Sequence, residues 1–370
     1  MGALLSDLDY VFLERAYELA ARGIGSTSPN PPVGAVVVRD GRIVGEGYHH
    51  RAGEAHAEVN ALAQARDRAA GSTAYLSLEP CNHVGRTPAC SHELLDAGVA
   101  RVVVGTIDPN PKTNGEGAAF LRAAGVRVDV AGDSRAEALI EIFAGSLGKT
   151  RPYVALKMAM SIDGAVASQV GVRQQLTGAA WSSFVRDLRI AHDAVMVGAG
   201  TIRVDDPLLT VRPPHHRLRP YVRVVACETD TVVESSRVFA NVDGYLKTIV
   251  LAPAGLRSHF EPLTHVADVV FAGDDASERL DLALAMRALR EREIYSVLCE
   301  GGPTLAARLV ADGLVDRVHW GIAPILLQRD GAVPVLSGVD FEALQRRLRF
   351  DRLARVGDDV LLSGTFACDV

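Results

Sequence analysis

The sequence predicts an α/β protein with two domains, and three observations support this prediction. Short apolar segments alternate with segments of helical periodicity along most of the chain, which is typical of layered α/β folds. The chain has 370 residues, which is more than one hydrophobic core usually supports. Glycine and proline interrupt the alternation between Gly145 and Pro152. We therefore expect one domain over residues 1–147 and a second over residues 151–370.

The first domain is expected to begin with a helix over residues 6–22, which opens with a Ser-x-x-Asp capping box. A hairpin then joins strands at 33–38 and 43–48, because the Asp40-Gly41 dipeptide suits a tight turn. Helices and strands alternate after this hairpin. The expected helices lie at 55–66, 91–97, 117–124 and within 131–150, and the expected strands at 74–78, 101–105 and 126–130.

The second domain resumes the alternation of strands and helices, and it contains no short internal repeat. The expected strands are 153–158, 194–197, 222–227, 248–251, 268–271, 294–300 and 317–322. The expected helices are 181–192, 279–292 and 303–312.

Composition excludes several classes of partner. Asp and Glu outnumber Lys and Arg by 45 to 39, which gives no basic footprint for nucleic acid or for an anionic membrane. No apolar run approaches the roughly 18 residues that a membrane helix needs. Of the five cysteines, Cys227, Cys299 and Cys368 have no paired framework, which is typical of a reducing compartment. We expect a cytoplasmic protein whose partners are small molecules.

His56, Cys81 and Cys90 supply one imidazole and two thiols, the ligand set of a catalytic zinc ion that keeps its fourth position for water. Glu58 lies two residues after His56, where a carboxylate can take a proton from that water and return it to a leaving amine. H-x-E followed by P-C and a second cysteine is the signature of zinc deaminases. The sequence departs from the usual C-x-x-C, because eight residues separate the two cysteines.

Three other interpretations of these residues remain open. The cysteines could be unrelated buried thiols, with His56 on the surface. The chain could be a non-catalytic scaffold that zinc stabilises, although structural zinc usually has four protein ligands. A deaminase of nucleosides or of tRNA adenosine would leave more than half of the chain without a role.

Further motifs resemble the bifunctional deaminase/reductase family of riboflavin biosynthesis. In the first half these are Pro29-Asn30-Pro31-Pro32-Val33-Gly34, His56-Ala57-Glu58, Glu79-Pro80-Cys81-Asn82-His83, Gly85-Arg86-Thr87-Pro88 with Cys90, and Asp108-Pro109-Asn110-Pro111. In the second half they are Leu156-Lys157, Ser161-Ile162-Asp163-Gly164, Asp205-Asp206-Pro207 and Glu300-Gly301-Gly302-Pro303. The resemblance therefore extends over both halves.

This resemblance implies a cytidine-deaminase-like three-layer domain followed by a dihydrofolate-reductase-like domain. It implies that the first domain uses Zn2+ to hydrolyse the 2-amino group of a diaminohydroxypyrimidine that bears a phosphoribosylamino chain. The second domain is then expected to use NADPH to reduce the ribose chain to ribityl. The resemblance also implies a homodimer.

The resemblance assigns roles to several residues of the first half. His56, Cys81 and Cys90 would bind zinc, and Glu58 would move the proton. The groups expected to contact the pyrimidine ring and the ribose are Asn30, His83 and Asn110. A turn residue, a solvated loop histidine and an Asx turn are the simpler explanations for these three.

In the second half, glycines follow two predicted strands. Gly301 and Gly302 can bring backbone N–H groups close to a pyrophosphate at a helix N-terminus, and residues 198–201 could act similarly. A tight turn or helix packing would also explain them. The resemblance places Ala159, Thr201 and Asp205 at the NADPH site. Arg189 and Arg212 suit a substrate phosphate, although a surface salt bridge is the commoner role of an arginine. The resemblance implies that Leu209 contacts the substrate, and Glu300 is expected to face it.

One segment departs from the family pattern. Arg173 stands where a serine is expected to reach the substrate, and Gln175 stands where a tryptophan is expected to pack on the cofactor. Residues 326–329 also replace an expected leucine-glycine turn. Arg173 becomes a candidate substrate residue. An alternative is a paralogue in a secondary pathway, making a flavin-like or azapteridine compound, with an intact deaminase and an altered or silent reductase.

Overall fold

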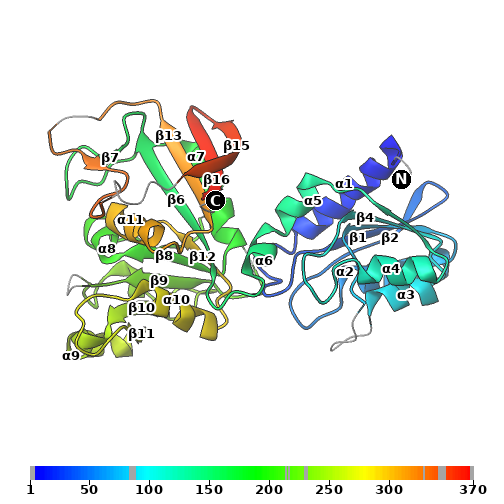
Figure 1. Cartoon of the computed structure of the whole chain (residues 1–370), viewed down its shortest axis with the longest axis horizontal. Helices are drawn as coiled ribbons and strands as arrows, with labels where there is room; N and C mark the ends of the chain where they lie inside the picture. Colours follow the sequence, from blue (N-terminus) through cyan, green and yellow to red (C-terminus); the bar gives the residue numbers. More distant parts are fainter. Residues whose placement is uncertain are drawn as a thin grey trace. The chain divides into compact units, whose positions relative to one another are not determined.

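The structure, a computed structural model, describes residues 5–82, 89–212, 215, 217–228, 232–327, 330–340 and 347–366. The chain forms two compact units, Met1–Leu147 and Gly148–Val370 (Figure 1). Each unit contains its own β-sheet with helices packed against it, which confirms the predicted α/β class.

A five-stranded sheet forms the centre of the first unit. Its strands are β1 (Gly34–Arg39), β2 (Arg42–Tyr48), β3 (Thr73–Leu78), β4 (Arg101–Thr106) and β5 (Arg127–Val130). Their order across the sheet is β2-β1-β3-β4-β5. β1 is antiparallel to both β2 and β3, whereas β3, β4 and β5 are parallel. The predicted hairpin is confirmed, with Asp40 and Gly41 both at positive φ in its turn.

Helices cover both faces of this sheet, so the unit has the three layers that the resemblance implied. They are α1 (Asp7–Ala21), α2 (Ala57–Ala65), η1 (Arg66–Ala69), α3 (Cys90–Asp96), α4 (Glu116–Ala123), α5 (Ser134–Leu139) and α6 (Glu141–Ser146). Ala61 of α2, Leu94 of α3 and Leu121 of α4 pack in one hydrophobic cluster. Leu13 of α1 and Ala136 of α5 belong to the cluster on the opposite face.

Two local features position helices α1 and α2 of this unit. The capping box at Ser6 and Asp9 is formed and begins α1 as predicted. On β2, a Cβ at Gly47 would lie 2.5 Å from the carbonyl oxygen of Ala57. Only glycine therefore allows the first turn of α2 to lie directly on the sheet, and this turn carries His56 and Glu58.

The second unit is built on a nine-stranded sheet in the order β11-β10-β9-β8-β12-β6-β13-β16-β15. These strands are β6 (Tyr153–Ser161), β8 (Ala194–Gly198), β9 (Val222–Ala226), β10 (Thr248–Pro253), β11 (Ala267–Ala272), β12 (Ser296–Cys299), β13 (Arg317–Ala323), β15 (Leu348–Val356) and β16 (Asp359–Phe366). A small separate sheet pairs β7 (Ala165–Ala167) with β14 (Val333–Pro334). The strands from β11 to β13 are parallel, and the last two are antiparallel.

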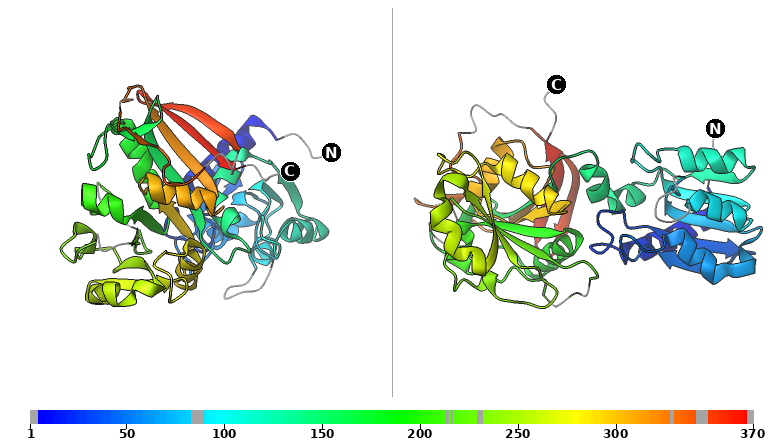
Figure 2. Two further views of the ribbon diagram at one scale, coloured as in Figure 1. Left: turned by 60° about the vertical axis from the view of Figure 1, so that its left-hand side comes forward. Right: turned by 90° about the horizontal axis from the view of Figure 1, so that it is seen from below.

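Helices lie on both faces of this larger sheet (Figure 2). They are α7 (Ala179–Ala191), α8 (Ala199–Asp205), η2 (Arg237–Phe239), η3 (Ala254–Leu256), α9 (Arg257–Phe260), η4 (Glu261–His265), α10 (Leu282–Glu291) and α11 (Pro303–Ala311). Met286 of α10 and Leu309 of α11 pack in the core on one face, and Ile202 of α8 and Phe260 of α9 pack on the other. The carboxyl ends of the central parallel strands therefore open between helical layers, where α/β proteins usually bind ligands.

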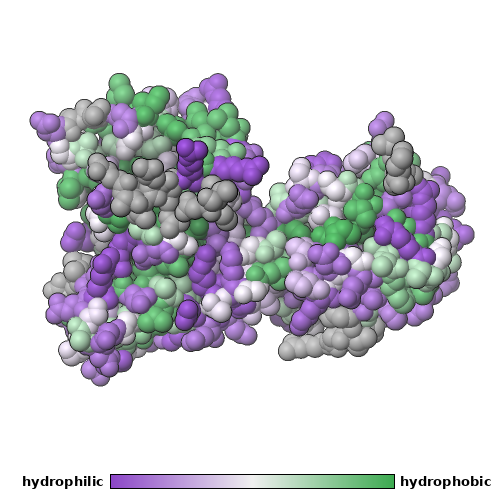
Figure 3. Space-filling view, in the orientation of Figure 1, coloured by the Kyte–Doolittle hydropathy of each residue, from purple (hydrophilic) through white to green (hydrophobic). Residues whose placement is uncertain are grey.

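On the face of the molecule shown in Figure 3, hydrophilic and hydrophobic residues are mixed over both units. No helix within the described ranges is long and apolar enough to cross a membrane.

Candidate active sites

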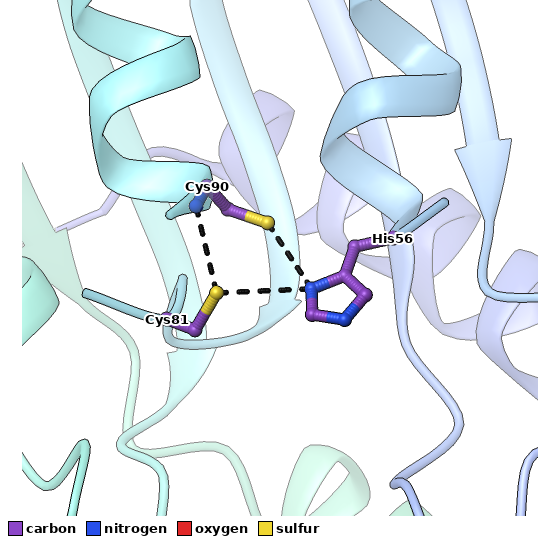
Figure 4. Close-up of side chains that lie close together, drawn as sticks. All are labelled: His56, Cys81 and Cys90. Atoms are coloured by element: carbon purple, nitrogen blue, oxygen red, sulfur yellow. Dashed lines mark hydrogen bonds between the residues drawn. The ribbon is translucent and has the colours of Figure 1, made fainter. Parts of the chain in front are cut away.

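The three predicted zinc ligands lie together in the first unit (Figure 4). His56 is the N-cap residue of α2, Cys81 follows the end of β3, and Cys90 is the first residue of α3. Their candidate ligand atoms all lie within 4.8 Å of one another. The imidazole presents Nδ1 to both sulfurs, at 3.2 Å from Cys90 Sγ and 3.7 Å from Cys81 Sγ.

This geometry fits a tetrahedral zinc ion. Ordinary Zn–N and Zn–S bond lengths place an imidazole nitrogen and a thiolate sulfur roughly 3.5 Å apart across a tetrahedral angle. The two observed distances lie on either side of that value. No fourth ligand joins these residues in the described part of the chain, so the cluster has the composition of a catalytic zinc site rather than a structural one.

The pKa values of the two cysteines shift in opposite directions. The hydrogen bond from Cys90, together with the bond to His56, lowers the pKa of Cys81 to about 4. The same bond and burial raise the pKa of Cys90. One thiol is therefore already disposed to be a thiolate, which is the form that binds metal.

Glu58 lies in the first turn of α2 and is 4% exposed. Burial raises its pKa above the ordinary glutamate value, although the nearby imidazole of His56 opposes the shift. A buried carboxyl group of this kind can hold a proton beside the ligand cluster. The sequence analysis placed Glu58 beside the zinc ligands, and its buried position two residues after His56 is consistent with that prediction.

Asn30 lies in a hydrogen-bonded chain that the sequence analysis did not predict. Its Nδ2 lies 3.1 Å from His49 Nε2, and His49 Nδ1 lies 3.1 Å from the carbonyl oxygen of Ala55. Since the amide nitrogen can only donate, His49 Nε2 accepts and Nδ1–H donates to Ala55. The Asn30 side-chain oxygen, Oδ1, takes no part in these two hydrogen bonds. In the sequence, only its position seven residues before His56 pointed to His49, and this is a weak signal.

Asn110 forms the Asx turn that was the simpler explanation for it. Its Oδ1 accepts from the backbone N–H of Lys112 at 3.1 Å, and its own N–H donates to Asp108 Oδ1 at 2.8 Å. The turn fixes the backbone and leaves Nδ2 as the group for a ligand. His83, the third predicted pocket residue, lies outside the described residues.

The second unit contains a cavity of about 960 Å³ at the carboxyl ends of the parallel strands. This volume suits a drug-sized ligand or larger. All but one of the residues predicted for the reductase site line it, namely Ala159, Arg173, Arg189, Thr201, Asp205, Arg212, Glu300, Gly301 and Gly302. The exception is Leu209, which is 4% exposed and packs in the hydrophobic cluster on the α8 face of the sheet.

Glu300 is held between two cations at the wall of this cavity. Arg189 forms a bidentate ion pair with its carboxylate, and Lys157 Nζ lies 3.4 Å from Oε2. Burial alone would raise the pKa of Glu300, but the charges of Arg189 and Lys157 lower it to about 2. Arg189 also donates to the carbonyl oxygen of Thr210 at 2.7 Å. Its guanidinium, predicted to bind phosphate, is thus largely engaged within the protein, and Lys157 is a site residue without a predicted role.

The two predicted glycine positions at the start of α11 differ in their surroundings. A Cβ at Gly301 would lie 2.9 Å from Leu305 Cδ2, so a side chain there would have to displace the end of the Leu305 side chain. At Gly302, the N-cap of α11, the nearest atom would be Thr201 Oγ1 at 3.4 Å. Gly302 therefore remains the candidate for a close backbone approach to a dinucleotide.

Arg173 and Gln175 have partners within the cavity wall. Arg173 lies 3.7 Å from the carboxylate of Asp205, with 71% of its side chain exposed. Gln175 donates its side-chain amide to the carbonyl oxygen of Thr177 at 2.8 Å. The departures from the family pattern thus place an exposed cation and an amide where a hydroxyl and an aromatic ring were expected. Part of the other departure, residues 328–329, lies outside the described residues.

Known families match both units. The family described as "Cytidine and deoxycytidylate deaminase zinc-binding region" matches residues 6–106, and the "RibD C-terminal domain" matches residues 152–362. The riboflavin biosynthesis protein RibD of Escherichia coli K12 is 38% identical over 377 residues, covering 96% of this chain and 98% of that protein. RibD of Actinobacillus pleuropneumoniae is 36% identical, covering 97% and 95% respectively.

Two solved structures are similar over the whole chain. Acinetobacter baumannii RibD has a TM-score of 0.81 and 32% identity, covering 98% of this chain and 99% of its own. The diaminohydroxyphosphoribosylaminopyrimidine deaminase/5-amino-6-(5-phosphoribosylamino)uracil reductase of Thermotoga maritima has a TM-score of 0.81 and 31% identity, covering 97% and 99%. These matches confirm the predicted fold class, including the cytidine-deaminase-like first unit.

Fold and site together define a two-domain enzyme, with a zinc-binding deaminase domain followed by a reductase domain. The similarity extends over nearly the full length of the relatives. The chain belongs to the RibD family of bifunctional riboflavin biosynthesis enzymes.

Proposed function

We propose that this chain catalyses two reactions of riboflavin biosynthesis. The first is hydrolytic deamination of 2,5-diamino-6-(phosphoribosylamino)pyrimidin-4-one, and the second is NADPH-dependent reduction of the ribosyl chain to ribityl. The single observation that carries the proposal is the His56, Cys81 and Cys90 cluster beside the buried Glu58. The relative from Thermotoga maritima is a deaminase and reductase of these compounds. We assign deamination to residues 1–147 and reduction to residues 151–370, which the two compact units support.

In the deaminase site, zinc held by His56, Cys81 and Cys90 would activate a water molecule for attack on the ring carbon that bears the amine. Glu58 takes a proton at its carboxylate and delivers it to the amino group as ammonia leaves. Asn30 Oδ1 and Asn110 Nδ2 offer an acceptor and a donor to the substrate. His83 is proposed as a further substrate contact.

In the reductase site, NADPH would supply the hydride to the substrate chain. Ala159, Thr201, Asp205, Gly301 and Gly302 are proposed to hold the cofactor, with Gly302 at the N-terminus of α11 near its pyrophosphate. Glu300 remains charged, so its carboxylate can accept hydrogen bonds from substrate hydroxyls. The substrate residues proposed with it are Arg173, Arg189, Leu209 and Arg212.

Assembly and location are part of the same proposal. The cysteines within the described ranges are free, which suits a reducing cytoplasm. We expect a homodimer, as the family resemblance implies, and a small-molecule pyrimidine substrate rather than nucleic acid or membrane.

Full-length similarity to RibD proteins favours this bifunctional enzyme over both alternatives, the secondary-pathway paralogue and the zinc-stabilised scaffold. Arg173 and Gln175 are the observations that would favour an altered reductase. These two residues change the wall of the cavity. The ion pairs of Glu300 with Lys157 and Arg189 are nevertheless formed, which favours a working reductase site.

Replacement of Glu58 by Gln tests the deaminase assignment. The amide keeps the shape of the side chain but cannot move the proton, so ammonia release should fall by roughly 10²- to 10⁴-fold. Zinc content, measured by atomic emission, should stay at the wild-type level. Glu54→Gln, at a half-exposed carboxylate four residues earlier, is the matched control and should release ammonia normally. Normal ammonia release by Glu58→Gln would contradict the assignment.

A further inference from the structure

Glu79 is a buried carboxylate near the zinc cluster that the proposed chemistry does not use. It is 3% exposed and lies two residues before Cys81, directly after β3. Its Oε2 accepts from the backbone N–H groups of Asp108 at 3.2 Å and Gly115 at 2.9 Å, and its Oε1 accepts from Ala118 at 2.9 Å. One side chain therefore ties the zinc loop, residues 79–82 with Cys81, to residues 108–118.

The start of α4 depends on this carboxylate. The N-cap residue of α4 is Gly115, which has no side chain to accept from the free N–H groups of the first turn. Glu79 supplies that acceptor from the neighbouring loop, and its negative charge lies at the positive end of the helix. A Cβ at Gly117 would lie 2.0 Å from the carbonyl oxygen of Pro80, so the helix rests on the backbone just before Cys81.

The same carboxylate fixes the loop that carries Asn110. It holds the backbone N–H of Asp108, whose own carboxylate accepts from the N–H of Asn110 at 2.8 Å. The Asx turn of Asn110 with Lys112 follows directly. Two buried carboxylates, those of Glu79 and Asp108, thus link the position of Asn110 to the segment that carries Cys81.

We propose that Glu79 is a positioning residue for deamination: it holds the Asp108–Asn110 loop and the start of α4 in register with the zinc loop. Asn110 then meets the pyrimidine in the orientation that attack on the ring requires. This inference rests on the proposed deaminase function and adds a residue to it that does not touch the substrate.

Glu79→Gln tests the inference, because the amide keeps the volume of the side chain but places an NH2 group against backbone N–H donors. We expect KM for the diaminopyrimidine substrate to rise by roughly 10- to 100-fold, the size of effect that misplaced substrate groups produce. Zinc content and NADPH-dependent reduction of the deaminated substrate by the same chain should not change. Backbone hydrogen exchange over residues 108–118 should accelerate. Glu116→Gln, at an exposed carboxylate in the first turn of α4, is the control that should leave all four readouts unchanged.

Three outcomes would contradict the proposed role of Glu79 or separate it from the proposed function. Retained zinc with wild-type KM and wild-type exchange would overturn the inference. Loss of zinc or unfolding of the first unit would also overturn it, because Glu79 would then act on the fold rather than on the loop. If the wild-type protein itself released no ammonia, the proposed function would fail, and the exchange of residues 108–118 alone would decide whether Glu79 holds the loop.

Discussion

At the residue scale, the reductase cavity is organised around one buried charge. Glu300 is ionised in a place where burial opposes ionisation, because Arg189 and Lys157 surround its carboxylate. Removing one charge from a buried ion pair leaves its partner unpaired, which is strongly destabilising. The Glu300 carboxylate is therefore important to the structure of the cavity wall, where it is proposed to contact the substrate.

Glu300→Gln should lower kcat/KM for reduction of the deaminated substrate by roughly 100-fold or more, because Arg189 and Lys157 lose their anionic partner. NADPH oxidation followed by absorbance measures this loss. Ammonia release should remain normal, and Glu291→Gln, an exposed carboxylate on α10, should leave reduction unchanged. Reduction at the wild-type rate by Glu300→Gln would contradict the proposed role of this carboxylate.

Arg173 allows a separate test of the departure from the family pattern. Its ion pair with Asp205 is largely exposed, and such pairs contribute at most about 1 kcal/mol to stability. Arg173→Ala should therefore leave the melting temperature nearly unchanged but raise KM for the substrate of reduction, because it removes the guanidinium proposed to contact that substrate. Arg355→Ala, at an exposed position of β15, is the control. An unchanged KM would remove Arg173 from the substrate site.

At the element scale, Asp316 anchors the first strand of the second unit. Its carboxylate accepts from Lys149 Nζ at 2.6 Å, from Arg151 at 2.6 and 2.8 Å, and from the backbone N–H of Val154 at 2.8 Å. Burial opposes ionisation, but these partners lower the pKa of Asp316 below its ordinary value. The start of β6 is thus fixed to the end of the loop before β13.

Asp316→Asn should destabilise the second unit by about 3 kcal/mol, because Lys149 and Arg151 lose a nearly buried partner. A lowered folded-state pKa contributes stability above the unfolded value of about 3.9, and this contribution is lost as pH falls below it. The difference between wild type and variant should therefore be full at neutral pH and shrink below about pH 4.

The fluorescence of Trp181 and Trp320, the two tryptophans of the chain, reports urea unfolding of this unit. Asp312→Asn, at an exposed position four residues earlier, is the control. A difference between wild type and Asp316→Asn that does not depend on pH would contradict the ion-pair explanation.

Most elements could be predicted from the sequence because apolar periodicity and capping are local signals. The β15–β16 hairpin was missed, although the Gly357-Asp358 dipeptide between β15 and β16 is a hairpin signal. The helix α8 was also missed, because its glycines were interpreted as a loop. His56, Glu58, Cys81 and Cys90 could be identified because metal chemistry restricts both residue type and spacing. Glu79 could not be identified, because its partners lie 29 to 39 residues away and are backbone groups without a sequence signature.

At the scale of the whole molecule, two chemically distinct sites lie on separate compact units of one chain. The predicted zinc ligands all belong to the first unit, and the cavity with Glu300 belongs entirely to the second. The product of deamination keeps the phosphoribosylamino chain on which the reductase is proposed to act. In the proposal, the order of the two reactions is the same as the order of the two units in the chain.

Removal of zinc should separate the two activities. Incubation with a zinc chelator, followed by desalting, should abolish ammonia release because no other described residues complete a metal site. Reduction of the deaminated substrate with NADPH should continue at the wild-type rate, and added zinc should restore ammonia release. Loss of both activities on chelation would show that zinc supports the second unit as well.

The most direct test of the bifunctional assignment uses the wild-type chain, zinc, NADPH and the diaminopyrimidine substrate in one reaction. Ammonia is measured by a colorimetric assay, NADPH by absorbance, and the pyrimidine products by mass spectrometry. We expect ammonia release and NADPH oxidation to reach the same molar amount and the ribityl product to accumulate. Accumulation of the deaminated ribosyl compound without NADPH oxidation, or oxidation without ammonia, would contradict it.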